Sequence, residues 1–205
     1  VGKNMTAVRE KDEIIVLDMG LNLDNYIKYT EDEDIVRITA SELVKAGAVP
    51  DIKDLEINKV KAIVITHAHL DHLGAAPFLS NKFNAPIVCT PYTASVLNAI
   101  IKDNKMILKN EIKEVSPNST YRISNNTKIE FINMTHSVPQ TVMVALHTKD
   151  GVLLYANDFK FDLYPGIGKK PNFKRLEELG KSGVKVLILD SIYASREQKT
   201  PSESV

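Results

Sequence analysis

The sequence predicts a layered α/β fold, and three observations support this prediction. The 205 residues are 43% hydrophobic and 25% charged, which is the composition of an ordinary globular domain. Short β-branched apolar runs alternate with segments whose apolar residues recur at three- and four-residue spacing, the pattern of strands alternating with helices. No internal repeat or low-complexity tract interrupts the alternation, so a solenoid and a disordered chain are excluded.

The first part of the chain is predicted to be a hairpin followed by a long connection. Residues 6–10 and 14–18 are strand-like and are separated by three polar turn residues. The connection over 18–61 contains one segment with helical spacing, at 40–46. An acidic run at 31–34 is interpreted as a solvated loop.

Strands and helices alternate over the rest of the chain. Further strands are predicted at 62–66, 87–90, 120–123, 128–134, 142–147, 152–157 and 184–190. Further helices are predicted at 75–83, 93–108 and 172–180. Thr200 followed by Pro201 has the signature of a helix start. Because a strand begins abruptly at one end and a helix starts at the other, we expect this chain to be a segment of a longer protein.

Cysteine usage and hydropathy indicate a reducing compartment, and we expect a cytoplasmic location. Cys89 is the only cysteine, so no internal disulfide can form, and its apolar neighbours predict a buried, inert thiol. No run approaches the roughly 18 consecutive apolar residues that a membrane-spanning helix needs, and no signal peptide opens the chain. We therefore expect no membrane partner.

The charge pattern is more informative than the net charge. The 26 basic and 26 acidic residues cancel, so composition alone does not indicate nucleic-acid binding. Residues 160–185, however, contain seven basic and three acidic side chains. This stretch, with Lys169, Lys170, Lys174 and Arg175 at its centre, is either a phosphate-binding rim or a solvated helix face.

Three of the five histidines fall within six residues, in Thr66-His67-Ala68-His69-Leu70-Asp71-His72. The segment follows an apolar strand and precedes small residues, which predicts a strand-to-helix loop at the carboxyl edge of a sheet, where binding crevices form. Two imidazoles that are two residues apart in an extended backbone can converge on one ion, while Asp71 and His72 project toward a second. The alternative is a set of surface histidines with Asp71 as a helix cap, which explains the clustering less well.

The histidine cluster resembles the hallmark motif of the metallo-β-lactamase superfamily of metal-dependent hydrolases. Three other strings resemble the family's pattern in chain order: Leu17-Asp18-Met19-Gly20, Thr135-His136-Ser137-Val138-Pro139-Gln140 and Asn157-Asp158-Phe159-Lys160-Phe161-Asp162. Longer strings at 1–6, 135–139, 158–162 and 200–204 are similar to the ribonuclease J family, most of all to its archaeal form.

The resemblance implies a fold and its limits. The implied fold is the metallo-β-lactamase fold, an αβ/βα four-layer sandwich, over residues 1–194. Residues 195–205 are then the start of an inserted β-CASP domain. On this interpretation the fold is incomplete here, because the rest of the insertion and the returning C-terminal part lie outside these residues.

The resemblance also implies a ligand set for two metal ions. His67, His69 and His136 hold one ion, Asp71 and His72 hold the second, and Asp158 bridges the two. Two zinc ions are the implied cofactor, with manganese as the alternative, since imidazole and carboxylate accept both metals. Asp71 and Asp158 are the implied catalytic carboxylates.

Four further residues are expected to support this site. Asp18 and Asp190 are interpreted as carboxylates that accept hydrogen bonds from ligand imidazoles and so fix their orientation. Ser137 and Lys160 are expected to contact RNA phosphate. His147 has no matching context and is expected to be structural.

The implied function is that of a two-metal ribonuclease that hydrolyses RNA phosphodiester bonds in the 5′→3′ exonuclease direction, with a hydroxide bridging the ions as nucleophile. RNA is the expected partner, and a homodimer of the full-length protein is a further expectation. The 205 residues alone are expected to be inactive, because one metal histidine of the family lies downstream. Three alternatives stay open: a small-molecule hydrolase of the thioesterase or lactonase type, a polyadenylation-factor-type RNA endonuclease, and a metal-stabilised scaffold.

Overall fold

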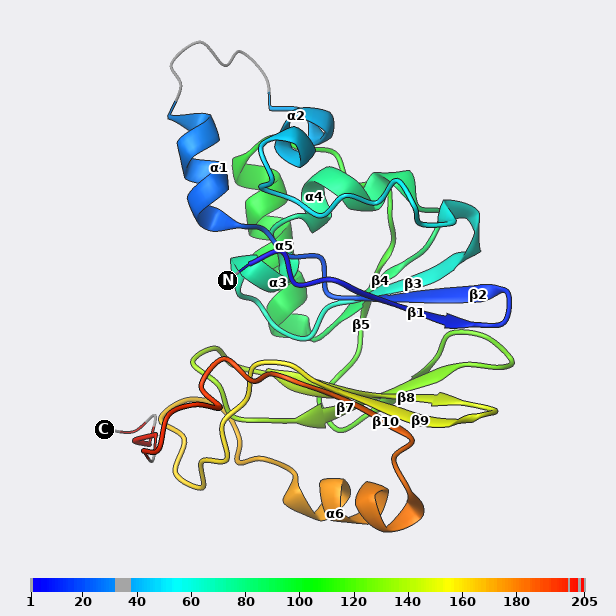
Figure 1. Cartoon of the computed structure of the whole chain (residues 1–205), viewed down its shortest axis with the longest axis vertical. Coiled ribbons are helices and arrows are strands. Elements are labelled where there is room, and N and C mark those ends of the chain that lie inside the picture. Colours follow the sequence, from blue (N-terminus) through cyan, green and yellow to red (C-terminus); the bar gives the residue numbers. More distant parts are fainter. Residues whose placement is uncertain (1, 32–37, 199, 203, 205) are drawn as a thin grey trace. The chain divides into compact units, whose positions relative to one another are not determined.

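A computed structural model describes residues 2–31, 38–198, 200–202 and 204, and the chain divides into two compact units. Unit 1 comprises Val1–Cys89 and Thr93–Glu114, and unit 2 comprises Thr90–Tyr92 and Val115–Val205. Each unit contains one five-stranded sheet (Figure 1). The division between the units falls inside the single domain predicted over 1–194, whose limits stay a prediction, and unit 2 continues past residue 194.

The sheet of unit 1 brings the ends of three parallel strands to one edge. Its strands, in spatial order, are β1 (Thr6–Glu10), β2 (Glu13–Leu17), β3 (Val60–Val64), β4 (Ile87–Cys89) and β5 (Ile112–Glu114). β1 and β2 form the predicted antiparallel hairpin, and all the other pairs are parallel. The segments that follow β2, β3 and β4 therefore leave the sheet at the same edge.

The helices of unit 1 share one hydrophobic core with this sheet. They are α1 (Leu23–Thr30), α2 (Ala40–Lys45), α3 (Leu70–Leu73), α4 (Ala76–Leu79) and α5 (Pro91–Asp103), with 3₁₀ turns at Ile57–Lys59 and Ser80–Lys82. Fully buried Leu43, Leu79 and Leu97 from three of these helices pack with Val16 and Ile63 from the strands. Removing these side chains from water is the main favourable contribution to the stability of this layer.

The sheet of unit 2 also collects strand ends at one edge. Its strands, in spatial order, are β10 (Val186–Leu189), β9 (Gly151–Ala156), β8 (Val142–Thr148), β7 (Lys128–Asn133) and β6 (Thr120–Arg122). β8 runs antiparallel to both β7 and β9, while β10 is parallel to β9. β7, β9 and β10 consequently run in the same direction, and the residues that follow them emerge together.

A partly buried ion pair fastens α6 (Phe173–Ser182) to this second sheet. Arg175 donates from Nε and Nη2 to the two carboxylate oxygens of Glu130, at 2.6 and 3.0 Å, and His147 Nε2 lies 3.0 Å from Glu130 Oε2. Leu179 packs below them against Ile132. The structure thus assigns Arg175 to an anchor of α6 and not to a phosphate-binding rim, and it gives His147 the structural role expected for it.

Most predicted strands are confirmed, and the differences fall on short elements. The predicted helix 75–83 is divided into α4 and a 3₁₀ turn. α1, α3 and β5 were not predicted. α3 and β5 are only four and three residues long, too short to show an apolar period. α1 has eight residues, with Leu23, Tyr26 and Ile27 at helical spacing, a short pattern that the sequence prediction missed.

Two predictions concern segments that the structure describes only in part. Apart from Glu31, the acidic run 31–34 lies outside the described residues. The helix expected from Thr200 onward is not formed by residues 200–202, and Glu203 and Val205 lie outside the described residues. Ser202 instead donates from Oγ to the carboxylate of Asp162.

The prediction for Cys89 is confirmed. The side chain is fully buried, and burial raises the pKa of its thiol to about 12, so the reactive thiolate is absent at neutral pH. Among the described residues, no helix has both the length and the apolar character to cross a membrane.

The Glu130 anchor predicts a loss of stability in acid. Burial raises the pKa of Glu130, but the hydrogen bonds from Arg175 and His147 lower it more, so its folded-state pKa lies below the ordinary value. The pair therefore stabilises the fold fully above pH of about 4.3, and this stability is lost as the pH falls through the lower folded-state pKa.

Glu130→Gln should lower the free energy of unfolding at pH 7 by about 2–3 kcal/mol and flatten its decline below pH 5. Urea unfolding at several pH values measures both effects. Glu177→Gln, which breaks an exposed pair with Lys181, is the matched control and should change little. An unchanged acid profile in the Glu130 variant would contradict this assignment.

Candidate metal centre

The histidine-rich loop follows β3 and turns at once into a single helical turn. The chain stays extended through His69, which is the N-cap of α3 with φ −72° and ψ 145°. His67 is fully buried and His69 is half-buried. This change of backbone places His67 and His69 on the extended part, and Asp71 and His72 on the helical turn.

The first pair has the spacing of two ligands on one ion. His67 Nε2 lies 3.2 Å from His69 Nδ1, and the rings meet edge to face with centroids 4.9 Å apart. Two imidazole nitrogens on a tetrahedral zinc, each about 2.0–2.1 Å from the ion, are about 3.3 Å apart. The loop therefore presents two nitrogen donors that fit zinc without rearrangement.

The second pair lies on the helical turn and is joined by an asparagine from the N-terminal segment. His72 Nε2 is 3.5 Å from Asp71 Oδ2. Asn4 Nδ2 lies 3.0 Å from His72 Nε2 and donates to Asp71 Oδ2 at 3.2 Å. A carboxylate and an imidazole on the same side form a mixed oxygen and nitrogen donor set, which suits zinc or manganese.

The carboxylate of Asp18 links the two pairs through hydrogen bonds, directly to His72 and through Thr66 to His67. Its Oδ1 accepts from Thr66 N at 2.8 Å and from Thr66 Oγ1 at 2.9 Å, and its Oδ2 lies 2.8 Å from His72 Nδ1. Thr66 Oγ1 is in turn 2.9 Å from His67 Nδ1. All four side chains are fully buried. These contacts occupy the Nδ1 atoms of His67 and His72 and leave their Nε2 atoms facing His69 and Asp71, the arrangement that orients metal-binding imidazoles.

A close backbone contact at Gly20 holds the helical turn against the end of β2. Met19 N donates to His72 O at 2.7 Å and Leu21 N donates to Leu70 O at 2.9 Å. A Cβ atom on Gly20 would lie 1.6 Å from the carbonyl oxygen of Asp71. This oxygen belongs to the backbone, so it could move only by displacing the helical turn. Only glycine permits this approach.

In unit 2, the predicted site residues His136, Asp158 and Lys160 follow strands that end at the same edge of the sheet. His136 follows β7 and Asp158 follows β9, and His136 Nε2 lies 3.4 Å from Asp158 Oδ2. Lys160 N donates to Thr135 O at 2.8 Å, which ties the Asp158 segment to the His136 segment.

The remaining predicted residues have less specific surroundings. Asp190 follows β10, and its Oδ1 accepts from Ile192 N at 3.0 Å, a local turn contact. Its expected bond to a ligand imidazole stays a prediction. Ser137 is exposed. The roles expected for Ser137 and Lys160 toward RNA also stay predictions.

Sequence reasoning missed Asn4, Thr66 and Gly20. Thr66 could have been predicted, because the hydroxyl of a residue directly before a metal-binding histidine is positioned to hydrogen-bond its imidazole. Asn4 is 67 residues before Asp71, and nothing local in the sequence indicates their contact.

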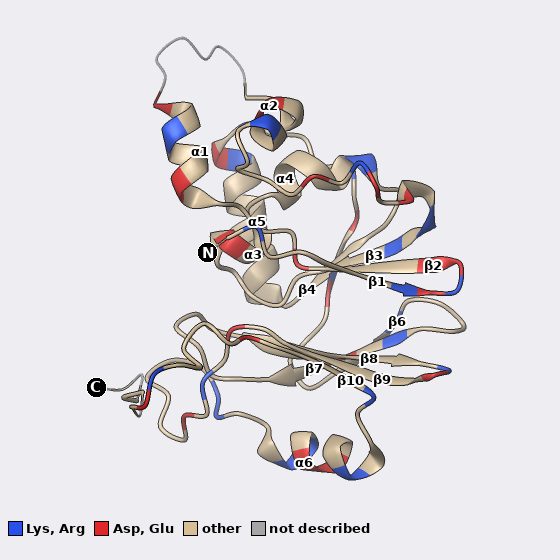
Figure 2. Cartoon of the chain, viewed as in Figure 1, with Lys and Arg blue, Asp and Glu red and all other residues tan. Residues whose placement is uncertain are grey.

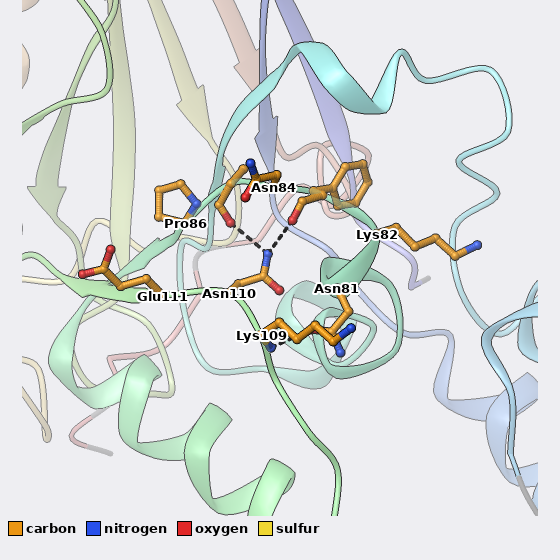
Figure 3. A pocket seen from close by; sticks show the side chains of 9 residues that line it. Asn81, Lys82, Asn84, Pro86, Lys109, Asn110 and Glu111 are labelled. Atoms are coloured by element: carbon orange, nitrogen blue, oxygen red, sulfur yellow. Dashed lines mark hydrogen bonds between the residues drawn. The ribbon is translucent and has the colours of Figure 1, made fainter.

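A cavity of about 480 Å³ in unit 1 is separate from the histidine loop (Figure 3). It is lined by residues 81–86 and 109–111, at the amino end of β4, whereas His67 follows the carboxyl end of the parallel strand β3. Asn110 Nδ2 donates there to the carbonyl oxygens of Ser80, Phe83 and Ala85 at 2.8–3.0 Å. These bonds hold the turn over residues 80–85 in place.

Comparisons with known proteins identify the family and the fold. The sequence model described as Metallo-beta-lactamase superfamily matches residues 1–171. The ribonuclease J proteins of Pyrococcus abyssi and Methanocaldococcus jannaschii are 42% and 40% identical to the chain, over all of the chain and 46% of each relative. The chain thus spans about half the length of these curated relatives. A solved protein of unknown function from Enterococcus faecalis shares the fold, with a TM-score of 0.68 and 17% identity over 98% of this chain and 50% of its own.

The Gly20 contact gives a test of the helical turn. Gly20→Ala should force Asp71 and His72 away from β2, lowering the free energy of unfolding by about 3 kcal/mol and weakening zinc binding about 10-fold or more. Denaturant unfolding and zinc titration measure the two effects. The control is Gly180→Ala, since no atom lies within 4 Å of the added Cβ. Wild-type stability and zinc affinity in the Gly20 variant would show that the contact is not constraining.

Proposed function

Because this chain belongs to the metallo-β-lactamase superfamily, we propose that it is the metal-binding part of a ribonuclease of the ribonuclease J type. The observation that carries the proposal is identity of 40% and 42% to two proteins named ribonuclease J, over the entire length of this chain. The fold alone would not distinguish RNA from other substrates, since one fold supports many activities.

We propose that the ligands of unit 1 and unit 2 act on the same pair of ions. His67, His69 and His136 would hold one ion, Asp71 and His72 the other, and Asp158 both. Support comes from two independent facts: His67 and His69 have the nitrogen spacing of a zinc pair, and His136 and Asp158 already lie together at one sheet edge. Zinc is the metal that this donor set suits best, with manganese as the alternative.

The protein's own groups would then position the substrate and the ligands. A pair of divalent ions, when bound, lowers the pKa of a shared water and stabilises the attacking and leaving oxygens of phosphoryl transfer. Asp18 holds the imidazole of His72 directly and that of His67 through Thr66, each in one orientation. The ligands therefore need no reorganisation during the reaction. Lys160 and Ser137 would donate to non-bridging phosphate oxygens.

The substrate and the direction of degradation extend the same proposal. RNA would be degraded from its 5′ end, as the resemblance to ribonuclease J implies. Residues 1–194 would form the catalytic domain, and residues 195–205 would begin a domain inserted into it.

We predict that His67→Ala or His69→Ala in the full-length protein reduces metal content and abolishes RNA hydrolysis, because each removes a direct ligand. Elemental analysis and cleavage of a 5′-monophosphorylated RNA labelled at its 5′ end measure both. Early release of labelled mononucleotide would support the 5′→3′ direction.

His147→Ala is the matched control, since His147 contacts Glu130 in the α6 anchor. It should keep its metal and its activity. Retained metal and activity in the His67 variant would contradict the ligand assignment, and hydrolysis of thioesters or lactones without RNA cleavage would contradict the proposed substrate.

A further inference from the structure

The segment between β9 and α6 exposes an unusual number of large apolar side chains. Four of them fall within seven residues: Phe161, Leu163, Tyr164 and Ile167, with exposed fractions of 62, 50, 71 and 61%. Single exposed apolar residues are common on soluble proteins, but a group of this kind marks a binding surface. We call residues 159–170 the aromatic loop.

The two exposed aromatic rings of this loop, Phe161 and Tyr164, are held in place. The Phe161 ring lies between those of Phe159 and Phe173, with centroids 5.0 and 5.3 Å away. Tyr164 N donates to Asp162 Oδ1 at 2.9 Å, in a turn that sets the position of the tyrosine. A ligand that uses these rings would therefore pay little conformational entropy to order them.

The base of the loop is anchored by buried polar groups. Asp162 is 7% exposed, and Ser202 Oγ donates to its Oδ1 and Oδ2 at 3.0 and 2.8 Å. At the far end, Asn133 Nδ2 donates to the carbonyl oxygens of Lys169 and Lys170 at 3.0 and 2.9 Å. Both ends of the aromatic loop are thus fixed to the rest of unit 2.

The charges beside the rings are mainly basic. Lys160, Lys169, Lys170 and Lys174 lie on this loop and the first turn of α6, and Asp162 is the one acidic residue among 159–174. Lys170 Nζ lies 5.3 Å from the centroid of the Tyr164 ring. Figure 2 shows basic residues in blue along the chain between β9 and α6 and on α6 itself.

A cavity of about 510 Å³ is lined by both exposed rings and by Lys160, together with residues 200–202. Its volume is in the range of pockets that hold small ligands. Rings that present exposed faces next to lysines are the recognition elements of single-stranded nucleic acid, in which bases stack and phosphates meet the cations.

We propose that the aromatic loop binds single-stranded RNA by stacking bases on Phe161 and Tyr164, with Lys160 and Lys170 contacting the adjoining phosphates. This inference rests on the proposed function for the class of substrate. It adds a surface that contacts the bases of RNA without sequence preference. The surplus of positive charge favours RNA over an apolar protein segment as the occupant.

Fluorescence anisotropy with metal-free full-length protein tests the inference independently of catalysis. Two labelled probes are compared: an oligouridine and an oligomer of the same length with abasic ribose in place of the nucleosides. Phe161→Leu and Tyr164→Leu should each weaken binding of oligouridine about 5- to 150-fold, the range for loss of one base–aromatic stack, and leave binding of the abasic probe unchanged.

Ile167→Ala is the matched control, because this side chain is as exposed as Phe161 but has no ring. It should bind both probes as the wild type does. Lys170→Gln should weaken both probes and reduce the salt dependence of binding. Circular dichroism checks that each variant is folded.

Three outcomes would overturn the inference. Equal losses for both probes would mean that the rings do not stack on bases. Losses in Ile167→Ala as large as in Phe161→Leu would indicate an apolar docking surface for protein. Unchanged oligouridine binding in both aromatic variants would exclude the loop from RNA binding. If the variants bind as proposed but the loaded wild-type protein cleaves no RNA, the proposed function fails and this inference stands.

Discussion

The candidate metal centre depends on one buried carboxylate. Asp18 follows β2 in a left-handed backbone conformation, with φ of 60°, that few residues other than glycine adopt. The hydrogen bonds to Thr66 and His72 offset the free-energy cost of this conformation, because they satisfy both carboxylate oxygens in a site that water does not reach. A charge that is buried in this way is stable only with such partners. The same bonds select which nitrogen of each histidine faces outward.

The topology of the sheets explains why the ligands come from distant positions in the sequence. Parallel strands carry Asp18 and the histidine loop to one edge of the first sheet. In the second sheet, β7 and β9 run in the same direction on either side of β8, so His136 and Asp158 emerge side by side although 22 positions separate them in the sequence. The helices of unit 1 pack on the first sheet, and α6 packs on the second, each through its own hydrophobic core. A rigid scaffold of this kind holds catalytic side chains more accurately than a free loop would.

The sequence predicted the elements that have a strong local signal and missed those that lack one. β2, β3, β7 and β8 contain mostly buried residues, and their apolar and β-branched side chains indicated a strand even where a polar residue such as Lys61 or Glu130 interrupts them. α3 could not be predicted, since a four-residue helix has no period to detect. The histidine cluster was evident from its spacing, and Asp18 was expected to orient its imidazoles, but the contacts made by Thr66 and Asn4 were not predicted. The contact of Asn4 with Asp71 joins segments that are 67 residues apart, so nothing local in the sequence indicates it.

Anomalous diffraction at the zinc absorption edge, from crystals of the full-length protein, tests the central claim most directly. We expect two zinc peaks, one bonded to His67 and His69 and the other to Asp71 and His72. We also expect Asp18 to remain outside both coordination spheres and to keep its bond to His72 Nδ1. Absence of zinc from the loop, or Asp18 bound directly to an ion, would contradict the claim that this carboxylate orients the ligands.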